Sequence, residues 1–419
     1  MSAGRLRDVD KPTTARGVSV PAATTGARRL TLALVAGVVF LYWVALYLYM
    51  PTLPTYAESK TDNLALVGVV LAQYGLWQAL IRLPLGIAAD WLGRRKPFIV
   101  AGFVLAGLGA LVIGTAGGVS GLIVGRAITG LAAGTWVPLV ALFSSLFPPE
   151  QAVRATALLT FIGSIGRMLA SAATASLNGW GGYTLAFFLA AGAALLAVLL
   201  VLPVQARRHA ARRPSLEGIG RLASRRDVLL PAVLAAVNQY ANWAATFSFV
   251  PILASQLGGT DATQSMLMSM HIGLLTLGNL AATAVVNRIG ARRIVILSFV
   301  LLALGLAGAA LAPSLPLLFA AQVCIGLSQG MGYPVLMGLS IRYVADTERT
   351  TAMGLHQAVY AIGMFGGPWL SGILADALGI RPMFGVTAFA CLAVGLVLAR
   401  WLVEGQGDTG TGRQGDKEI

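Results

Sequence analysis

The sequence predicts an all-α integral membrane protein with twelve transmembrane helices arranged as two six-helix bundles. Its 419 residues are 57% hydrophobic and only 11% charged, whereas soluble domains carry about 25% charged residues. Apolar runs of about 20 residues, the length that spans a bilayer core, recur along the chain. We expect helices because lipid cannot satisfy an open backbone and because the alternation typical of barrel strands is absent.

Twelve such runs follow one another, with boundaries defined to within a few residues. They lie at about 30–56, 64–89, 97–117, 119–147, 152–177, 183–203, 229–257, 263–287, 293–312, 314–343, 350–377 and 381–402. The junction between the third and fourth runs is the tightest, since GGVSG at 117–121 is its only break.

The segments outside these runs divide the chain. A linker at 204–228, which contains seven arginines, separates a first bundle at 30–203 from a second bundle at 229–403. The amino-terminal tail at 1–29 is rich in Ala, Thr, Gly and Arg, a composition that predicts disorder. Residues 404–419 form a carboxyl-terminal tail.

The net charge of +14 is unevenly distributed between the two sides of the predicted membrane domain. Of the 30 Lys and Arg, 25 lie in the tails, the linker and the loops on one side, against only Lys60 and Arg381 on the other. Because basic residues mark the cytoplasmic side, we expect both termini in the cytoplasm of a multi-pass cell (plasma) membrane protein. No segment is long enough to carry a basic patch for nucleic acid, so the lipid bilayer is the expected partner.

Three arginines, Arg82, Arg126 and Arg167, lie inside the predicted helices, whereas all 16 Asp and Glu lie in tails, loops or helix ends. An unpaired arginine at mid-helix costs about 2.5–3.5 kcal/mol on insertion scales, so each should face a cavity or a partner. Cys324 and Cys391 lie in apolar runs, without the spacing of a disulfide framework or a metal site. We expect no metal and no cofactor.

The two halves of the chain share an internal repeat. GLAAGTWVP at 130–138 and GLSQGMGYP at 326–334 share the pattern G-L-x-x-G-x-x-x-P. DWLGRRK at 90–96 aligns with NRIGARR at 287–293 at nearly the same offset. Parallel six-helix repeats joined by a cytoplasmic linker are a known plan of transporters.

A motif after the second predicted helix points to a family. Its pattern is G-x-x-x-D-x-x-G-R-R, filled by Gly86, Asp90, Gly93, Arg94 and Arg95. It resembles the signature loop between helices two and three of the major facilitator superfamily. Arg126 and Gly130 fill R-x-x-x-G, which looks like a second signature, and YMPTLPTYA at 49–57 is similar to a stretch of the exporter branches. The resemblance covers about residues 30–403 and implies the major facilitator fold.

The signature loop is a candidate gate. Gly86, Asp90 and Gly93 should lie on nearly one face of the helix as it leaves the membrane, where glycines allow close approach and Asp90 can accept hydrogen bonds. Arg94 and Arg95 would anchor the turn at the headgroups. The resemblance implies a cluster that holds the bundles together on the inner side and breaks on reopening. A topology signal alone is the alternative, but it needs neither Asp90 nor the glycine spacing.

The three interior arginines are expected to differ in role. Arg82 lies ~12 Å deeper than Asp90 and is assigned to the gate, with bonding to carbonyls or a helix end as its structural alternative. The resemblance points Arg126 towards the central cavity, with helix packing as the alternative. Arg167 lies near mid-membrane and departs from the glycine- and proline-rich pattern that drug antiporters of the family carry there.

Further polar side chains lie on helices that line the cavity in this family. With Arg126 and Arg167, the candidate substrate set is Gln73, Gln78, Asn238, Asn242, His271, Gln329, Tyr333, His356, Gln357 and Tyr360. Any one of them alone is more often an interhelical hydrogen bond than a ligand contact, and we expect about half of the set to lie near the substrate.

These features predict a secondary active transporter that moves a small organic solute by alternating access, with export favoured. No paired carboxylates, Ser/His/Asp set or H-E-x-x-H motif occurs, so we do not expect an enzyme. The G-x-x-x-x-G-K-[ST] loop of ATP-driven proteins is also missing. A membrane receptor or a channel is the alternative from another class, but twelve helices in two repeated halves fit neither well.

The substrate class and the coupling stay open. Buried arginines without a buried acid favour an organic anion, a carboxylate or a phosphate ester, whereas the signature loop and the stretch at 49–57 look like small-molecule exporters. The membrane carboxylate usual in proton-coupled carriers is missing. A coupling proton would therefore move through His271, His356 or Asp90, and uniport or anion exchange are the other options. We expect a monomer.

Overall fold

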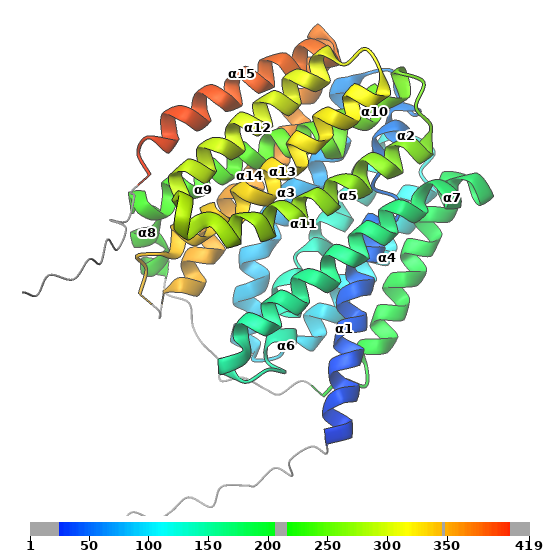
Figure 1. The fold of residues 1–419 in the computed structure, drawn as a ribbon. Coiled ribbons are helices and arrows are strands. Elements are labelled where there is room, and N and C mark those ends of the chain that lie inside the picture. The colour runs from blue at the N-terminus through cyan, green and yellow to red at the C-terminus, as the bar shows by residue number, and fades with distance from the viewer. Residues whose placement is uncertain (1–24, 206–215, 346–347, 403–419) are drawn as a thin grey trace, which may run out of the picture.

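The computed structural model describes residues 25–205, 216–345 and 348–402, which are helical with short connections and contain no strand. The disorder expected for most of the amino-terminal tail falls on residues 1–24, outside the described residues. Figure 1 shows the helices as two groups, with the second half of the chain at the upper left and much of the first half at the lower right.

The first bundle, residues 25–205, comprises α1 (Thr25–Tyr47), α2 (Leu53–Glu58), α3 (Leu64–Leu92), α4 (Lys96–Gly114), α5 (Val119–Ala133), α6 (Trp136–Ser144), η1 (Pro149–Gln151) and α7 (Ala152–Val201). The first predicted run corresponds to α1 with α2, and the fourth corresponds to α5 with α6. The long α7 is two helices that meet at Gly181 and Gly182, where Gly182 has a φ of 66°. Glycine adopts that conformation without strain, so it permits the bend between the fifth and sixth predicted helices.

The second bundle, residues 216–402, comprises α8 (Leu216–Ala223), α9 (Arg226–Ala244), η2 (Ala245–Phe249), α10 (Val250–Gln256), α11 (Asp261–Ile289), α12 (Ala291–Leu311), α13 (Leu315–Ile341), α14 (Arg349–Leu378) and α15 (Ile380–Ala399). The seventh predicted run is divided because η2 is one turn of π-helix between α9 and α10. The short helix α8 lies within the predicted linker and was not anticipated from the sequence.

Ten segments of the described residues are long and apolar enough to cross a membrane. One of them, Arg154–Val201, contains the two helices that meet at Gly181 and Gly182. The α9–η2–α10 segment is not among the ten. The predicted class, an all-α integral membrane protein, is confirmed, and the helices are consistent with twelve spans.

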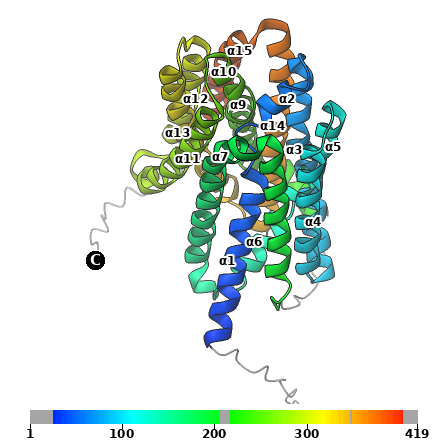
Figure 2. The same ribbon diagram turned by 90° about the vertical axis from the view of Figure 1, so that its right-hand side faces the viewer.

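The two ends of the bundles differ. We call the end where α1 begins and α15 ends the tail side, and the end with α2, α10 and the Gly181–Gly182 bend the far side. On the far side α2 packs against α10, whereas Figure 1 shows α6 and α8 well apart on the tail side. Figure 2 shows α1 running from the tail side towards α2 and α10.

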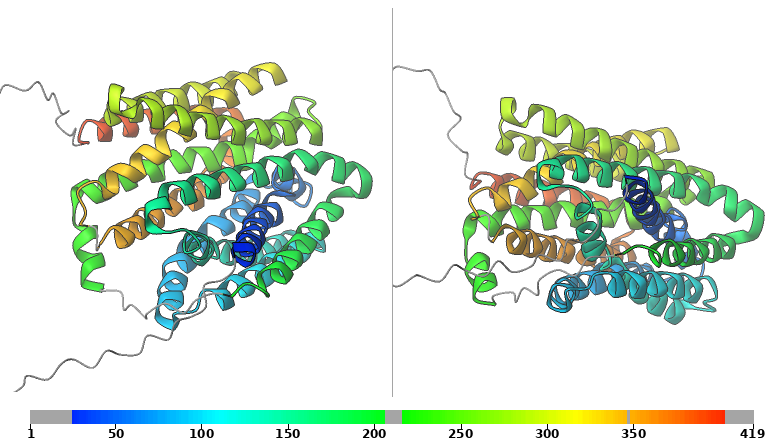
Figure 3. Two further views of the ribbon diagram at one scale, coloured as in Figure 1. Left: turned by 60° about the horizontal axis from the view of Figure 1, so that its bottom comes forward. Right: turned by 90° about the horizontal axis from the view of Figure 1, so that it is seen from below.

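Two helix pairs join the bundles along their length. α3 packs along α14, and α7 packs along α11; the views of Figure 3 show α7 crossing over the first bundle towards the second. The α3–α14 seam is built on glycine, since a Cβ on Gly372 would lie 2.8 Å from the Cα of Gly68. Helices in lipid associate by close backbone packing of this kind because no hydrophobic force drives them together.

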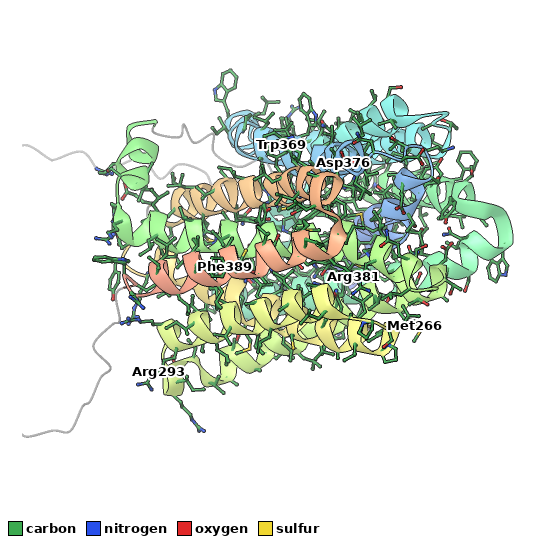
Figure 4. The ribbon with its side chains drawn as sticks, turned by 90° about the horizontal axis from the view of Figure 1, so that it is seen from above. Met266, Arg293, Trp369, Asp376, Arg381 and Phe389 are labelled. Carbon is green, nitrogen blue, oxygen red and sulfur yellow. The ribbon has the colours of Figure 1, made fainter. Side chains whose placement is uncertain are left out.

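Large apolar side chains cover the outside of the helices, as expected for a surface in contact with lipid. Phe389 on α15 is 76% exposed and Met266 on α11 is 62% exposed. Figure 4 shows Met266 at the edge of the second bundle and Phe389 on α15. The polar side chains of the predicted substrate set, by contrast, are largely buried between helices. The fold therefore concentrates its polar groups in the interior.

Candidate functional site

An acidic side chain closes the far side between the bundles. Asp261, the first residue of α11, accepts a hydrogen bond of 2.8 Å from Nδ2 of Asn178 and one of 3.4 Å from the hydroxyl of Tyr183. Asn178 also donates to Oγ1 of Thr52 at 3.1 Å. Hydrogen bonds to a charged acceptor contribute about 1.5–3 kcal/mol each when well formed, so these bonds favour a closed far side.

Two further hydrogen bonds cross between the bundles on the far side. Oγ1 of Thr55 on α2 donates to Oε1 of Gln264 on α11 at 3.0 Å. The backbone N–H of Leu64, at the start of α3, donates to Oδ1 of Asp376 at 3.0 Å, and Figure 4 shows Asp376 on α14 next to the first bundle. A carboxylate at a helix start is favoured by the helix dipole.

We name the cross-bundle set the far-side clasp. It consists of Thr55, Leu64, Asn178, Tyr183, Asp261, Gln264 and Asp376. Sequence reasoning did not select these side chains, because their polar character at helix ends is equally compatible with solvated loops.

An aromatic layer joins the two bundles on the tail side of the clasp. The ring of Tyr74 on α3 stacks on Trp243 of α9 with centroids 5.3 Å apart, and Tyr47 of α1 meets Phe247 of η2 edge-on at 6.2 Å. Trp243 stacks on Phe247 at 4.6 Å. All four side chains are buried. Because aromatic pairs contribute ~0.5–1.5 kcal/mol beyond their burial, this layer also holds the bundles together.

Arg126 on α5 is the most enclosed of the interior arginines, with 1% of its surface exposed. Its guanidinium lies 4.7 Å from the ring centroid of Tyr74, and Nη1 lies 3.9 Å from Sδ of Met50. Nε and Nη2 have no hydrogen-bond partner among the described residues. Because these N–H donors are unpaired among the described residues, the guanidinium can donate to a further acceptor or to an anion.

Gly130 explains the spacing of the R-x-x-x-G motif. A Cβ on Gly130 would lie 2.8 Å from the backbone oxygen of Tyr74. This glycine therefore allows α5 to pack directly on α3. Arg126, one turn earlier, is thereby placed over the Tyr74 ring.

A polar triad forms in the second bundle from three helices. Nε2 of Gln322 on α13 donates to Oγ1 of Thr246 at 2.9 Å, and this hydroxyl lies 3.4 Å from Nδ1 of His271 on α11. All three are buried, and Nε2 of His271 and Oε1 of Gln322 have no partner among the described residues. Thr246 lies on the π-helical turn η2, and such turns occur frequently at functional sites.

The predicted amide side chains differ in whether they have a hydrogen-bond partner in the structure. Nε2 of Gln329 donates to the backbone oxygen of Asn238 at 2.9 Å, while both side-chain polar atoms of Asn238 and Oδ1 of Asn242 are buried without a partner among the described residues. Oε1 of Gln78 is buried in the same way. Gln73 instead bonds within α3, to Val69 and to the exposed Trp77. Among the described residues, no hydrogen bond joins it to the other members of the set.

Arg82 crosses to the second bundle. Its Nη1 donates to the hydroxyl of Tyr360 on α14 at 2.7 Å, which replaces the carbonyl or helix end expected as its structural partner. The ring of Tyr333 lies 5.6 Å from Tyr360 and 6.2 Å from His356. Nδ1 of His356 lies 2.7 Å from Oγ of Ser340. Arg82, which was assigned to the gate, thus contacts Tyr360 of the predicted substrate set, and the ring of Tyr360 packs against two other members of that set.

Arg167 and Gln357, the remaining members of the predicted substrate set, are less deeply buried than most of the others. Arg167 on α7 is half-buried and donates to the carbonyl of Gly163 at 3.2 Å and to Oγ of Ser164 at 3.4 Å. It also lies 4.6 Å from the ring centroid of Trp43. These partners all belong to the first bundle. Gln357 on α14 is half-buried, and its side chain has no hydrogen bond among the described residues.

The signature loop is partly described. α3 ends at Leu92, and Gly93 follows with a φ of 62°, so this glycine forms the turn. The expectation that Gly93 shares a helix face with Gly86 is therefore wrong. A Cβ on Gly86 would lie 3.5 Å from Val137, an ordinary contact. Arg95 donates to the carbonyl of Ala141 at 3.0 Å. Arg94 is exposed, and the side chain of Asp90 lies outside the described part of the structure.

Comparison with known proteins identifies the fold. The model of the Major Facilitator Superfamily matches residues 35–241 and 232–418. The inner membrane transport protein YajR of Escherichia coli is 34% identical over 142 residues, which are 33% of this chain and only 30% of that protein. An uncharacterized MFS-type transporter, MJ1560 of Methanocaldococcus jannaschii, is 20% identical over 380 residues, covering 86% of this chain and 96% of that protein.

A solved structure shows the same architecture. The crystal structure of a bacterial homologue of the human lysosomal transporter Spinster, in its inward-facing and unoccupied conformation, superposes with a TM-score of 0.75. It is 14% identical and covers 89% of this chain and 97% of its own. Because the family model accounts for both halves of the sequence, this chain belongs to the Major Facilitator Superfamily and is a multi-pass membrane transporter.

Proposed function

We propose that the protein is a secondary active carrier that exports a small organic solute across the cytoplasmic membrane by alternating access. The distribution of contacts between the bundles carries this proposal. Four hydrogen bonds of the far-side clasp join them on one side. Nearest the tail side, the last hydrogen bond that joins the bundles among the described residues is the one from Arg82 to Tyr360.

The sides are assigned from charge. The loops and segments of the tail side carry nearly all of the basic residues, and such residues stay in the cytoplasm. The tail side is therefore the cytoplasmic side in this proposal, and the described conformation is closed towards the outside. Export is favoured by the resemblance of residues 49–57 to exporter branches.

The substrate would bind between the bundles, near mid-membrane. Arg126 with Tyr74 on one side, and the triad of Thr246, His271 and Gln322 on the other, supply buried polar atoms that have no partner among the described residues. Buried polar groups are normally hydrogen-bonded, so atoms of this kind mark places where a ligand can complete the bonding. On reopening, the clasp and the aromatic layer would separate while the tail side closes.

The proton is the candidate coupling ion. No Asp or Glu side chain is among the buried polar residues of the described chain, but His271 and His356 are fully buried in helices that reach the interface. Each has a ring nitrogen without a partner among the described residues. Coupling through either histidine predicts that a pH gradient accelerates export and that replacing the coupling histidine abolishes this acceleration without preventing exchange.

The experiment is a binding screen followed by transport in reconstituted vesicles. Compounds that raise the melting temperature of the purified protein would be loaded into proteoliposomes and their release measured. Arg126→Ala should abolish release while the protein stays folded. Arg381→Ala is the matched control, because the hydrogen bond that Arg381 makes among the described residues goes to the carbonyl of Ala310, on the far side of the second bundle. Failure of every stabilising compound to cross the vesicle membrane would refute the proposal.

An organic anion is the second candidate substrate class, and Arg126 is the observation that favours it. Neither ion pair of the described residues involves this buried guanidinium, whose planar fork matches carboxylate and phosphate geometry. Benzoate, benzyl alcohol and benzylamine offer the same ring with negative, neutral and positive charge. Selective stabilisation by benzoate that is lost in Arg126→Ala, and not restored in Arg126→Lys, would support the anion. Stabilisation by benzylamine alone would exclude it.

A further inference from the structure

A cavity lies on the tail side of the first bundle, away from the interface between the bundles. It has a volume of about 730 Å³ and lies between the start of α4 and the end of α7. This volume falls within the ~300–1,000 Å³ range of small-ligand sites. None of the proposed transport residues other than Arg94 and Arg95 lines it. The cavity therefore needs an explanation of its own.

Positive charge dominates the wall of this cavity. Arg94, Arg95 and Lys96 line it, and no Asp or Glu is among the described residues of its wall. Nζ of Lys96 donates to the carbonyls of Leu202 and Val204 at the end of α7, the second at 3.1 Å. An ammonium group carries three N–H donors, so one remains after these two bonds. α4 begins at Lys96, so the positive end of its dipole faces the cavity as well.

Apolar surface continues from the cavity along the two helices. Val104 and Leu108 of α4 are 47% and 48% exposed, and Leu199 and Leu202 near the end of α7 are 54% and 52% exposed. A cationic cavity at the ends of membrane-spanning helices, above an exposed apolar strip, matches a molecule with an anionic head and apolar chains. Basic pockets between transmembrane helices bind lipid headgroups in this way.

We propose that this cavity binds the phosphate-bearing headgroup of an anionic phospholipid in the tail-side leaflet. Arg94 and Lys96 contact the phosphate, and the acyl chains lie along α4 and the end of α7. A free phosphate would satisfy the cations equally well, but it would leave the apolar strip without a role. The site does not depend on the proposed direction of transport or on the transported solute.

Native mass spectrometry of the full-length protein in detergent tests the site, by titration with phosphatidylglycerol and with phosphatidylcholine of identical acyl chains. Phosphatidylglycerol should bind more tightly, and Arg94→Gln and Lys96→Gln should each weaken it roughly fivefold. Arg293→Gln is the matched control, because Arg293 aligns with Lys96 in the internal repeat. Figure 4 shows its exposed side chain pointing away from the helices. Arg94→Gln keeps the test valid if loss of the Lys96 bonds destabilises the fold.

Three results would overturn the proposal. Equal affinity for the two lipids would show that charge is not recognised. A similar loss of affinity in Arg293→Gln would show a diffuse electrostatic effect in place of a site. Binding of glycerophosphate or inorganic phosphate as tight as that of phosphatidylglycerol, and equally sensitive to Arg94→Gln, would assign the cavity to a soluble anion.

Discussion

Replacing Gly372 by leucine should open the far side of the carrier. A Cβ at this position would lie 2.8 Å from the Cα of Gly68 and 3.0 Å from the backbone oxygen of Leu64, both on α3. Carbon atoms in contact are about 3.5–4.0 Å apart, and backbone atoms cannot rotate away as a side chain does. The helices α3 and α14 must therefore separate by roughly 1 Å in the closed state.

The magnitude follows from the cost of overpacking. Extra methylenes in a packed interface cost about 1–3 kcal/mol. The open state does not bear this cost, because α3 and α14 separate there. The ratio of open to closed molecules should then rise roughly 5- to 150-fold. In lipid, the change should appear as a conformational shift more than as unfolding.

The assay is the reaction rate of a cysteine within the clasp. In a Thr55→Cys background, Gly372→Leu should raise the rate of modification by an impermeant maleimide by the same factor, up to the rate of a fully open state. Gly385→Leu is the control, since a Cβ on Gly385 has no atom within 4 Å. An unchanged rate in folded Gly372→Leu protein, or an equal increase in Gly385→Leu, would refute the reasoning.

Three other predictions follow from single residues. For topology, Ser59→Cys should be labelled from outside intact cells and Ser224→Cys should not; external labelling of Ser224→Cys would reverse the assignment of sides. Tyr360→Phe should destabilise the protein by about 1–3 kcal/mol, because the buried Arg82 loses its hydrogen-bond acceptor, and a denaturation curve that matches the wild type would show that this bond is not needed. Asp90→Asn should fold normally but transport poorly, as measured by vesicle release; wild-type release would reduce the signature loop to a topology signal.

The helices could be predicted from the sequence because bilayer thickness sets their length and lipid forbids unpaired backbone. Bilayer thickness also explains why the bend at Gly181 and Gly182 falls between the predicted fifth and sixth helices. The turn in η2 could not be predicted, since nothing in the ATFSF segment at 245–249 separates a π-helical turn from an α-helical one. Thr246 was therefore missed, although it holds His271 and Gln322 together.

The predicted site, too, was only partly accessible from the sequence. The motif indicated that Arg126 is buried and its glycine explains how, but helix periodicity predicts only the face on which a residue lies, not the helix that faces it. The bond from Arg82 to Tyr360 joins residues 278 positions apart in sequence, and the clasp around Asp261 joins helix ends of different bundles. Such pairs depend on how the bundles dock, which requires the three-dimensional structure.

The most direct test of alternating access is a pair of distance distributions in one protein. Spin labels at Lys60→Cys and Gln256→Cys report the far side, and labels at Ser145→Cys and Ala345→Cys report the tail side; all four positions are exposed. Double electron–electron resonance in lipid should show two distances for each pair, with a transported compound shifting the two pairs in opposite directions. A single distance at both pairs that no transported compound changes would contradict alternating access in this protein.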